Sequence, residues 1–283
     1  MNAKKGRAEM AVLSPEEYRS MVRRGEWPQD LSSEFCCEGY TQHGLVVLPR
    51  DWAYDYLLFC SRNPKVCYSC DATEPGSPHP PLLAPQADLR TDIGRYRVFK
   101  DGEVIDEPTD IKKYWRDDLV AFLTPCSFSF EGVLRSCNVN FRYIGTFTSK
   151  IPTVPAGRFK SVHTCVTCRL FKTSRDAVRA IQITSRFPTA HAAPIHIGDP
   201  SLIGIKDVYH PEPGRYNPHP TKPPPPQEPS EVMMFWACAE TPTHLIVTAK
   251  PPLAITHCRG MLFISDWLTE ELAYMEEIAP NLV

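Results

Sequence analysis

Long apolar runs, an excess of charge of one sign and abundant histidine are all missing from this 283-residue sequence. No apolar run approaches the roughly 20 residues that a membrane-spanning helix needs. The 31 basic and 33 acidic side chains nearly cancel, which excludes nucleic-acid or membrane-surface binding driven by bulk charge. The opening stretch MNAKKGRAEMAVL has no apolar core of secretory type. We therefore expect an intracellular, cytoplasmic protein, with a mitochondrial presequence left open.

Cysteine is more frequent, at eleven residues, but the number is odd and no secretory signal accompanies it. This favours a reducing compartment over a disulfide framework. Two C-x-x-C pairs, Cys67–Cys70 and Cys165–Cys168, have the spacing of zinc ligands. However, HTCVTCRLF alternates like a strand, which places Cys165 and Cys168 on opposite faces. We therefore expect unpaired, semi-buried thiols and predict no metal ligand set.

The first half of the chain carries clear helix and turn signals. In SPEEYRSMVRRGEW, Ser14 and Glu17 form a capping box and Gly25 ends the helix. A short strand over 44–50 runs into a helix over 52–63. Asp101-Gly102 predicts a type I′ hairpin turn. TDIKKYWRDDLVAFL reads as an amphipathic helix, with Trp115, Leu119, Phe122 and Leu123 on one face.

The second half alternates strands and helices more regularly. TCVTCRLF, PIHIGD, VMMFWACA, AITHC and MLFISD read as strands, and TSRDAVRAIQITSRF and PTHLIVTAK read as helices. This rhythm predicts an α/β fold with helices on the faces of a mixed sheet. Residues 211–229 hold nine prolines in nineteen positions, which predicts a surface loop of polyproline type.

Two strand-to-helix junctions suggest where chemistry occurs. Asp199-Pro200 and Thr241-Pro242 each place a capping residue before a proline at the start of a helical turn. The carboxyl ends of strands that face helix N-termini are where α/β folds bind anions. Polar residues gather near these predicted strand ends: Arg169, Arg186, His191, His196, Asp199, Cys238, Thr241, His257 and Asp266.

Several of these residues also have a purely structural explanation. Capping explains Asp199, a helix dipole explains Arg186, and a hydrogen-bonded buried ring explains His196. As a group they supply a carboxylate anchor and side chains that move protons near neutral pH, which favours an enzyme acting on a small acidic substrate.

Ordered blocks along nearly the whole chain resemble the D-glutamate cyclase family, which is also known as a hydro-lyase family. The blocks include LVVLPRDWAYDYLLFCSRNPKVC, DAVRAIQITSRFPTAHAAPIHIGDP, FWACAETP and KPPLAITHCRGMLFISD. The resemblance implies cyclisation of D-glutamate to 5-oxo-D-proline with loss of water. It also implies one domain (1–283) of two packed lobes, a smaller α+β lobe drawn from 89–160 and a larger sandwich-like lobe from 161–283 with the N-terminal segment.

The chain departs from the family pattern at several positions. Ala192 stands where glycine is usual, Met261 replaces a histidine, and FWACGVTPQ has become FWACAETPTH, which introduces Glu240 and His244. Some of these changes fall in the expected site, so altered specificity or weakened activity is left open.

For the implied reaction we expect substrate carboxylates to be held by Arg186 or Arg169, and the remaining substrate contacts to come from His191, Thr241 and Cys238. His196 is the expected acid or base and Asp199 its orienting partner, with His257 and Asp266 as second choices. No cofactor is identified, a divalent cation is left open, and the oligomeric state is not indicated. The alternatives are dehydration of another small hydroxy or amino acid, and a binding or scaffold protein that keeps the pocket and uses the proline-rich loop for docking.

Overall fold

The computed structural model describes residues 7–28, 31–210 and 224–273. Its helices are α1 (Arg7–Ala11), α2 (Pro15–Arg23), α3 (Arg50–Arg62), α4 (Phe128–Ser136), α5 (Ser174–Thr184) and α6 (Thr241–Ala249). Short 3-10 helices are η1 (Lys112–Tyr114), η2 (Pro188–Ala190), η3 (Pro200–Ile203) and η4 (Thr269–Ala273). No helix in these ranges is long and apolar enough to cross a lipid bilayer.

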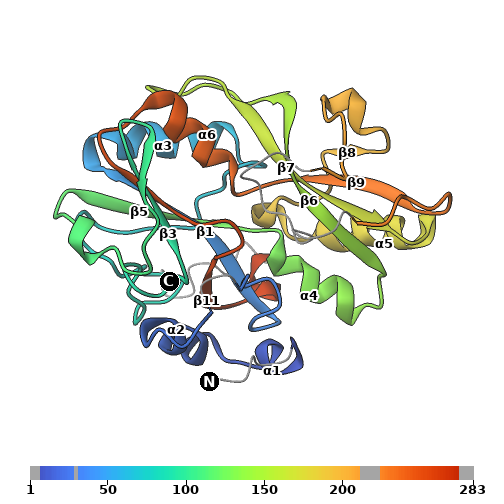
Figure 1. Cartoon of the computed structure of the whole chain (residues 1–283), viewed down its shortest axis with the longest axis horizontal. Helices are drawn as coiled ribbons and strands as arrows, with labels where there is room; N and C mark the ends of the chain where they lie inside the picture. Colours follow the sequence, from blue (N-terminus) through green and yellow to red (C-terminus); the bar gives the residue numbers. More distant parts are fainter. Residues whose placement is uncertain (1–6, 29–30, 211–223, 274–283) are drawn as a thin grey trace, which may run out of the picture.

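The strands form two sheets that lie beside each other (Figure 1). Sheet A contains β1 (Tyr40–Pro49), β2 (Asp71–Ala72), β3 (Tyr96–Lys100), β4 (Glu103–Asp106), β5 (Leu119–Pro125), β10 (Ala254–His257) and β11 (Phe263–Leu268). Its order is β2-β5-β1-β10-β3-β4, with β11 also paired to β1. Sheet B, in the order β6-β7-β9-β8, contains β6 (Phe141–Pro152), β7 (His163–Phe171), β8 (His196–Ile197) and β9 (Val232–Ala237).

The α/β class predicted from the sequence is confirmed, but the mixed sheet is not. Every strand pair in the described ranges is antiparallel. The β7-α5-β8 unit does bring its two strands into the same direction, because both pair antiparallel with β9. However, β9 lies between them, so the parallel strands never become neighbours.

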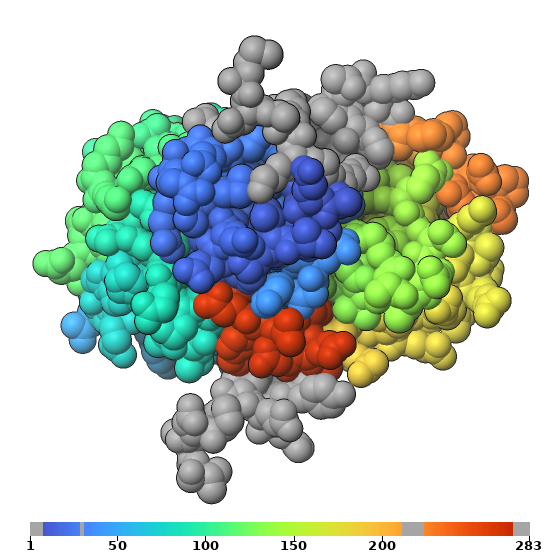
Figure 2. All heavy atoms as spheres, turned by 90° about the horizontal axis from the view of Figure 1, so that it is seen from below, coloured from blue at the N-terminus to red at the C-terminus, as the bar shows by residue number. Residues whose placement is uncertain are grey.

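Each sheet is covered on both faces, which accounts for its buried strands. On one face of sheet A, α3 and α6 pack Tyr56, Phe59, Leu245 and Ile246 against β1 and β5, while the irregular segment 83–93 covers the other face. On sheet B, α4 and α5 pack against Phe171 and Trp236, and the segment 203–208 covers the opposite face. Seen from below, the blue helices α1 and α2 and the red segment that holds β11 and η4 lie across the middle of the molecule (Figure 2).

Two of the local structures predicted from the sequence, a capping box and a hairpin turn, are confirmed. The Ser14 capping box of α2 forms, with the Glu17 amide donating to Ser14 Oγ at 3.2 Å. Asp101 and Gly102 have φ values of 50° and 83°, as a type I′ turn requires. Of the predicted loop over 211–229, residues 211–223 lie outside the described residues, and the exposed residues 225–228 form coil that leads into a turn at 229.

The helix predicted over residues 109–123 is wrong. The structure has only the short η1 there, followed by the strand β5, in which all seven residues are buried. A strand covered on both faces is apolar throughout, and its residues then also match the spacing of an amphipathic helix.

How the chain divides into lobes stays a prediction. Strands between residues 89 and 160 contribute to both sheets: β3, β4 and β5 join sheet A, and β6 joins sheet B.

Candidate active site

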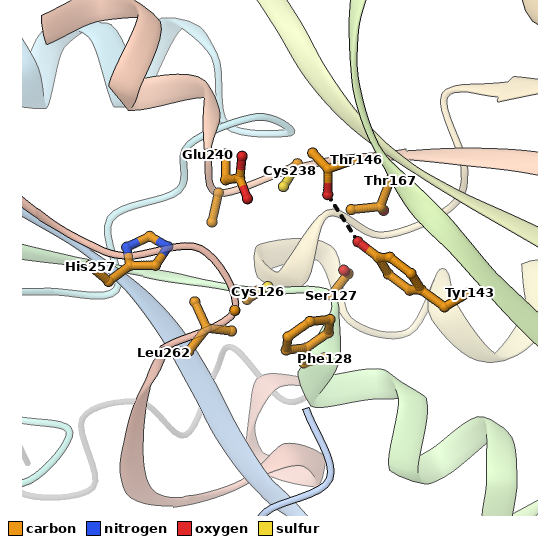
Figure 3. A pocket seen from close by; sticks show the side chains of 12 residues that line it. Cys126, Ser127, Phe128, Tyr143, Thr146, Thr167, Cys238, Glu240, His257 and Leu262 are labelled. Atoms are coloured by element: carbon orange, nitrogen blue, oxygen red, sulfur yellow. Dashed lines mark hydrogen bonds between the residues drawn. The ribbon is translucent and has the colours of Figure 1, made fainter. Parts of the chain in front are cut away.

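A cavity lies where the two sheets meet (Figure 3). We call it the intersheet cavity; its walls are Cys126, Ser127, Phe128, Tyr143, Thr146, Thr167, Cys238, Ala239, Glu240, His257, Gly260 and Leu262. Its volume is about 20 Å³, room for about one water molecule. Side chains or loops in its wall must therefore move before a small amino acid can enter.

Strand register places the hydroxyl groups of the cavity. Thr146 on β6 and Thr167 on β7 are directly opposite each other in the ladder, so both side chains project from the same face of sheet B. Tyr143 reaches this group from the same strand, with its hydroxyl 3.0 Å from Thr146 Oγ1 (Figure 3). Ser127 comes from the turn between β5 and α4, and so from the sheet A side.

His257 ends β10 and presents a defined tautomer. The Leu45 amide donates to His257 Nδ1 at 3.0 Å, so the neutral ring carries its proton on Nε2. Nε2 points toward the interior of the cavity (Figure 3). Burial, with the nearby Arg97 charge, lowers the pKa of His257 to about 4. Near neutral pH this imidazole is therefore an uncharged hydrogen-bond donor.

The glycine at position 44 makes room for this ring. A Cβ at Gly44 would lie 3.0 Å from His257 Cε1 and 3.0 Å from the Ala239 methyl group. Contacts that close are rare in proteins, so a side chain here would displace the imidazole or the β9–α6 junction.

Glu240 is the one acidic residue in the cavity wall among the described residues. It sits at the β9–α6 junction, with 8% of its surface exposed. The cavity thus has one carboxylate acceptor facing several neutral donors.

The two cysteines of the cavity are poor nucleophiles. Burial raises the pKa of the Cys126 thiol to about 11 and holds that of Cys238 well above its usual value, so both remain protonated near neutral pH. All eleven cysteines are free thiols, and the described residues contain no group of three or more side chains suited to a metal ion.

Of the residues singled out from the sequence, His257 and Cys238 line the cavity, and Thr241 and Arg169 lie directly behind it. The Thr241 hydroxyl accepts from the Cys165 amide at 3.1 Å and donates to the Cys238 carbonyl at 2.9 Å, which ties β7 to the β9–α6 junction. Arg169 is fully buried and contacts Ser127 and Thr167.

The other five residues lie elsewhere. His196 is on β8, the edge strand of sheet B, where its Nε2 donates to the Asp199 carbonyl at 2.7 Å. Asp199 caps η3 by accepting from the Ser201 amide at 2.9 Å. Arg186 is exposed after α5, and Asp266 pairs with Arg19 at 2.7 Å.

His191 is buried outside the cavity wall, with Nδ1 3.1 Å from the Lys65 carbonyl. His191 and Ala192 have φ values of 72° and 50°. The second value places Ala192 in left-handed backbone, which glycine adopts without steric cost.

Sequence reasoning did not select Ser127, Tyr143, Thr146 or Thr167, and it noted Glu240 only as a departure from the family pattern. One signal was present: Thr167 and Arg169 are two apart on a predicted strand, so they share a face. Their partner Ser127 is distant in sequence and could be placed only by the fold.

Comparison with known proteins identifies the family. The family model described as D-glutamate cyclase matches residues 120–266, a range that holds the whole cavity wall. Proteins named "Putative hydro-lyase" from Geobacillus kaustophilus and Psychrobacter arcticus are 44% and 40% identical, each covering 94% of this chain and 98% and 99% of their own lengths. Another from Stutzerimonas stutzeri is 42% identical over 92% of this chain and 96% of its own. The chain belongs to the D-glutamate cyclase family.

Proposed function

We propose that this protein is a hydro-lyase that cyclises D-glutamate to 5-oxo-D-proline in the intersheet cavity. The observation that carries the proposal is the pairing of the Glu240 carboxylate with neutral donors in a single cavity. A carboxylate suits a substrate ammonium group, and hydroxyl and imidazole donors suit its carboxylates. The family description and the relatives' hydro-lyase names point to the same class of reaction.

The reaction balances without an outside proton donor. The substrate nitrogen attacks the γ-carboxyl carbon, a C–N bond forms, a C–O bond breaks, and the oxygen leaves as water. The two protons lost by the ammonium group are those gained by the leaving oxygen. One side chain that accepts a proton and then returns it therefore suffices.

Glu240 is the residue that we propose for this proton transfer, and the assignment is specific to this chain because the family pattern FWACGVTPQ has valine at this position. It is a buried carboxylate in the cavity wall, and carboxylates serve both as bases and, once protonated, as acids. His257 suits a different role, because protonation of its Nδ1 would leave the buried Leu45 amide without an acceptor. We assign His257 Nε2–H to polarising the γ-carboxyl group and stabilising the oxyanion that forms there.

The test is to incubate the protein with D-glutamate and to measure 5-oxoproline by chiral chromatography, with L-glutamate in parallel. Glu240→Gln keeps the shape of the side chain but not the base, and we expect it to lower kcat by about 10²- to 10⁴-fold. Glu103→Gln, an exposed residue on β4, is the matched control and should match the unmodified protein.

Absence of turnover with every acidic amino acid, with or without divalent cations, would refute the proposal. Turnover of another hydroxy or amino acid would instead identify a related dehydratase. Thermal stabilisation by D-glutamate without turnover would identify a binding protein.

A further inference from the structure

A buried ion pair lies immediately behind the intersheet cavity. Arg169 on β7 and Glu131 on α4 are both fully buried, and Arg169 Nε donates to Glu131 Oε1 at 2.8 Å. The guanidinium is also enclosed by aromatic rings at 4.8–5.4 Å from their centroids: Phe130, Tyr143 and Trp236. Its charge is thus neutralised by Glu131, and it does not itself line the cavity.

Two further hydrogen bonds connect Arg169 to the cavity wall. Nη1 donates to Thr167 Oγ1 at 2.8 Å, and Nη2 donates to Ser127 Oγ at 2.9 Å. A guanidinium has only donors and keeps its proton at any pH a protein tolerates. Both hydroxyl oxygens must therefore act as acceptors toward Arg169, and each hydroxyl proton must point away from it.

Ser127 and Thr167 line the cavity and Arg169 lies behind them, so a hydroxyl proton that points away from Arg169 can point into the cavity. The Ser127 hydroxyl also interacts with the Cys126 thiol, which is only a weak acceptor that a carboxylate would outcompete.

We propose that Arg169 is a positioning residue that fixes the Ser127 and Thr167 hydroxyls as a pair of donors for a negatively charged substrate oxygen. Its guanidinium orients them from behind, without contacting the substrate. The inference rests on the proposed function for the identity of the substrate, but the donor pair would recognise any small carboxylate that fits the cavity.

The first experiment removes one hydroxyl at constant shape. We expect Thr167→Val to lower kcat/KM for D-glutamate by about tenfold or more, and Thr167→Ser to recover most of that loss. Thr184→Val is the matched control, because Thr184 on α5 is equally buried and its hydroxyl makes no hydrogen bond within the described residues. Ser127→Ala should behave like Thr167→Val.

The kinetic constants distinguish where the oxygen sits. A fall in kcat alone places the oxyanion of the transition state on the hydroxyl pair. A rise in KM, with weaker calorimetric binding of glutarate, places a substrate carboxylate there. Either result supports the proposal. If Thr167→Val and Ser127→Ala both leave kcat, KM and glutarate binding unchanged, the proposal is overturned.

A double-mutant cycle then tests the role of Arg169. Lysine keeps the charge but lacks the planar fork that reaches two hydroxyls, so Arg169→Lys should lower activity. If Arg169 acts through Thr167, adding Thr167→Val to Arg169→Lys should lower kcat/KM by less than about threefold beyond the loss that Arg169→Lys causes alone. Fully additive losses, in variants whose thermal unfolding shows them to be folded, would overturn the positioning role.

The experiments distinguish failure of the hydroxyl donor pair from failure of the proposed D-glutamate reaction. If the unmodified protein does not turn over D-glutamate but its glutarate affinity falls in Thr167→Val, the donor pair stands and the assigned reaction does not.

Discussion

Acid should destabilise this protein well before its carboxylates are protonated, because three histidines are buried in uncharged form. Burial lowers the pKa of His43 to about 3 and those of His191 and His257 to about 4. An unfolded chain binds a proton at each of these rings below pH 6.5 or so, and the native protein does not. The free energy of unfolding therefore falls as pH drops from about 6.5 toward 4.

The size of the effect follows from these values. Between pH 8 and pH 5, each of these rings lowers the free energy of unfolding by about 2 kcal/mol, and the three together lower it by about 6 kcal/mol. Asp71 acts in the opposite direction, since burial raises its pKa. A loss of about 6 kcal/mol is a large share of the 5–15 kcal/mol that typically stabilises a domain.

Urea unfolding at pH 8, 7, 6 and 5 measures this dependence. His191→Asn provides the internal test, because asparagine tolerates the left-handed backbone at this position and can still donate to the Lys65 carbonyl. It should reduce the loss between pH 8 and pH 5 by about a third. His163→Gln removes an exposed ring and serves as the control. An unfolding free energy that changes by less than about 1 kcal/mol over this range, or an unchanged loss in His191→Asn, would refute the reasoning.

Three further substitutions test other parts of the structure. Gly44→Ala places a methyl group against the His257 ring and should lower kcat in the 5-oxoproline assay more than it lowers the melting temperature. Ala192→Gly relieves left-handed backbone and should raise the free energy of unfolding by roughly 0.5–1 kcal/mol in urea titration. Glu131→Gln leaves the Arg169 charge buried without its partner and should lower the free energy of unfolding in urea by about 3–5 kcal/mol. An unchanged free energy of unfolding would show that water reaches the pair.

The sequence predicted elements wherever a local signal defined them. Capping residues located α2, and the Asp101-Gly102 turn located the β3–β4 hairpin. The helix predicted over residues 109–123 is wrong at 119–123 because burial on both faces of a strand removes the alternation that distinguishes a strand from a helix. Their identity as β5 depends on α3 and the segment 83–93, which cover them from either side.

The expected site depended on an assumption about the sheet. Carboxyl ends of strands share one edge only when the strands are parallel, and here neighbouring strands run in opposite directions. Residues at different strand ends, such as His196 and His257, consequently lie in different parts of the molecule. The cavity is built instead from long-range pairings between the sheets, which no local pattern reveals.

The pairing of β1 has a consequence for biosynthesis. β1 takes one neighbour from β5, but its other partners are β10 and β11, which begin about 200 residues after β1 ends. At 5–20 residues per second, a ribosome needs roughly 10–40 s to supply them. During that interval the central strand of sheet A has an open edge of unpaired amides and carbonyls. The nascent chain is therefore exposed to aggregation until its last strands emerge, and chaperones that shield strand edges should raise the yield of folded protein more than they raise its final stability.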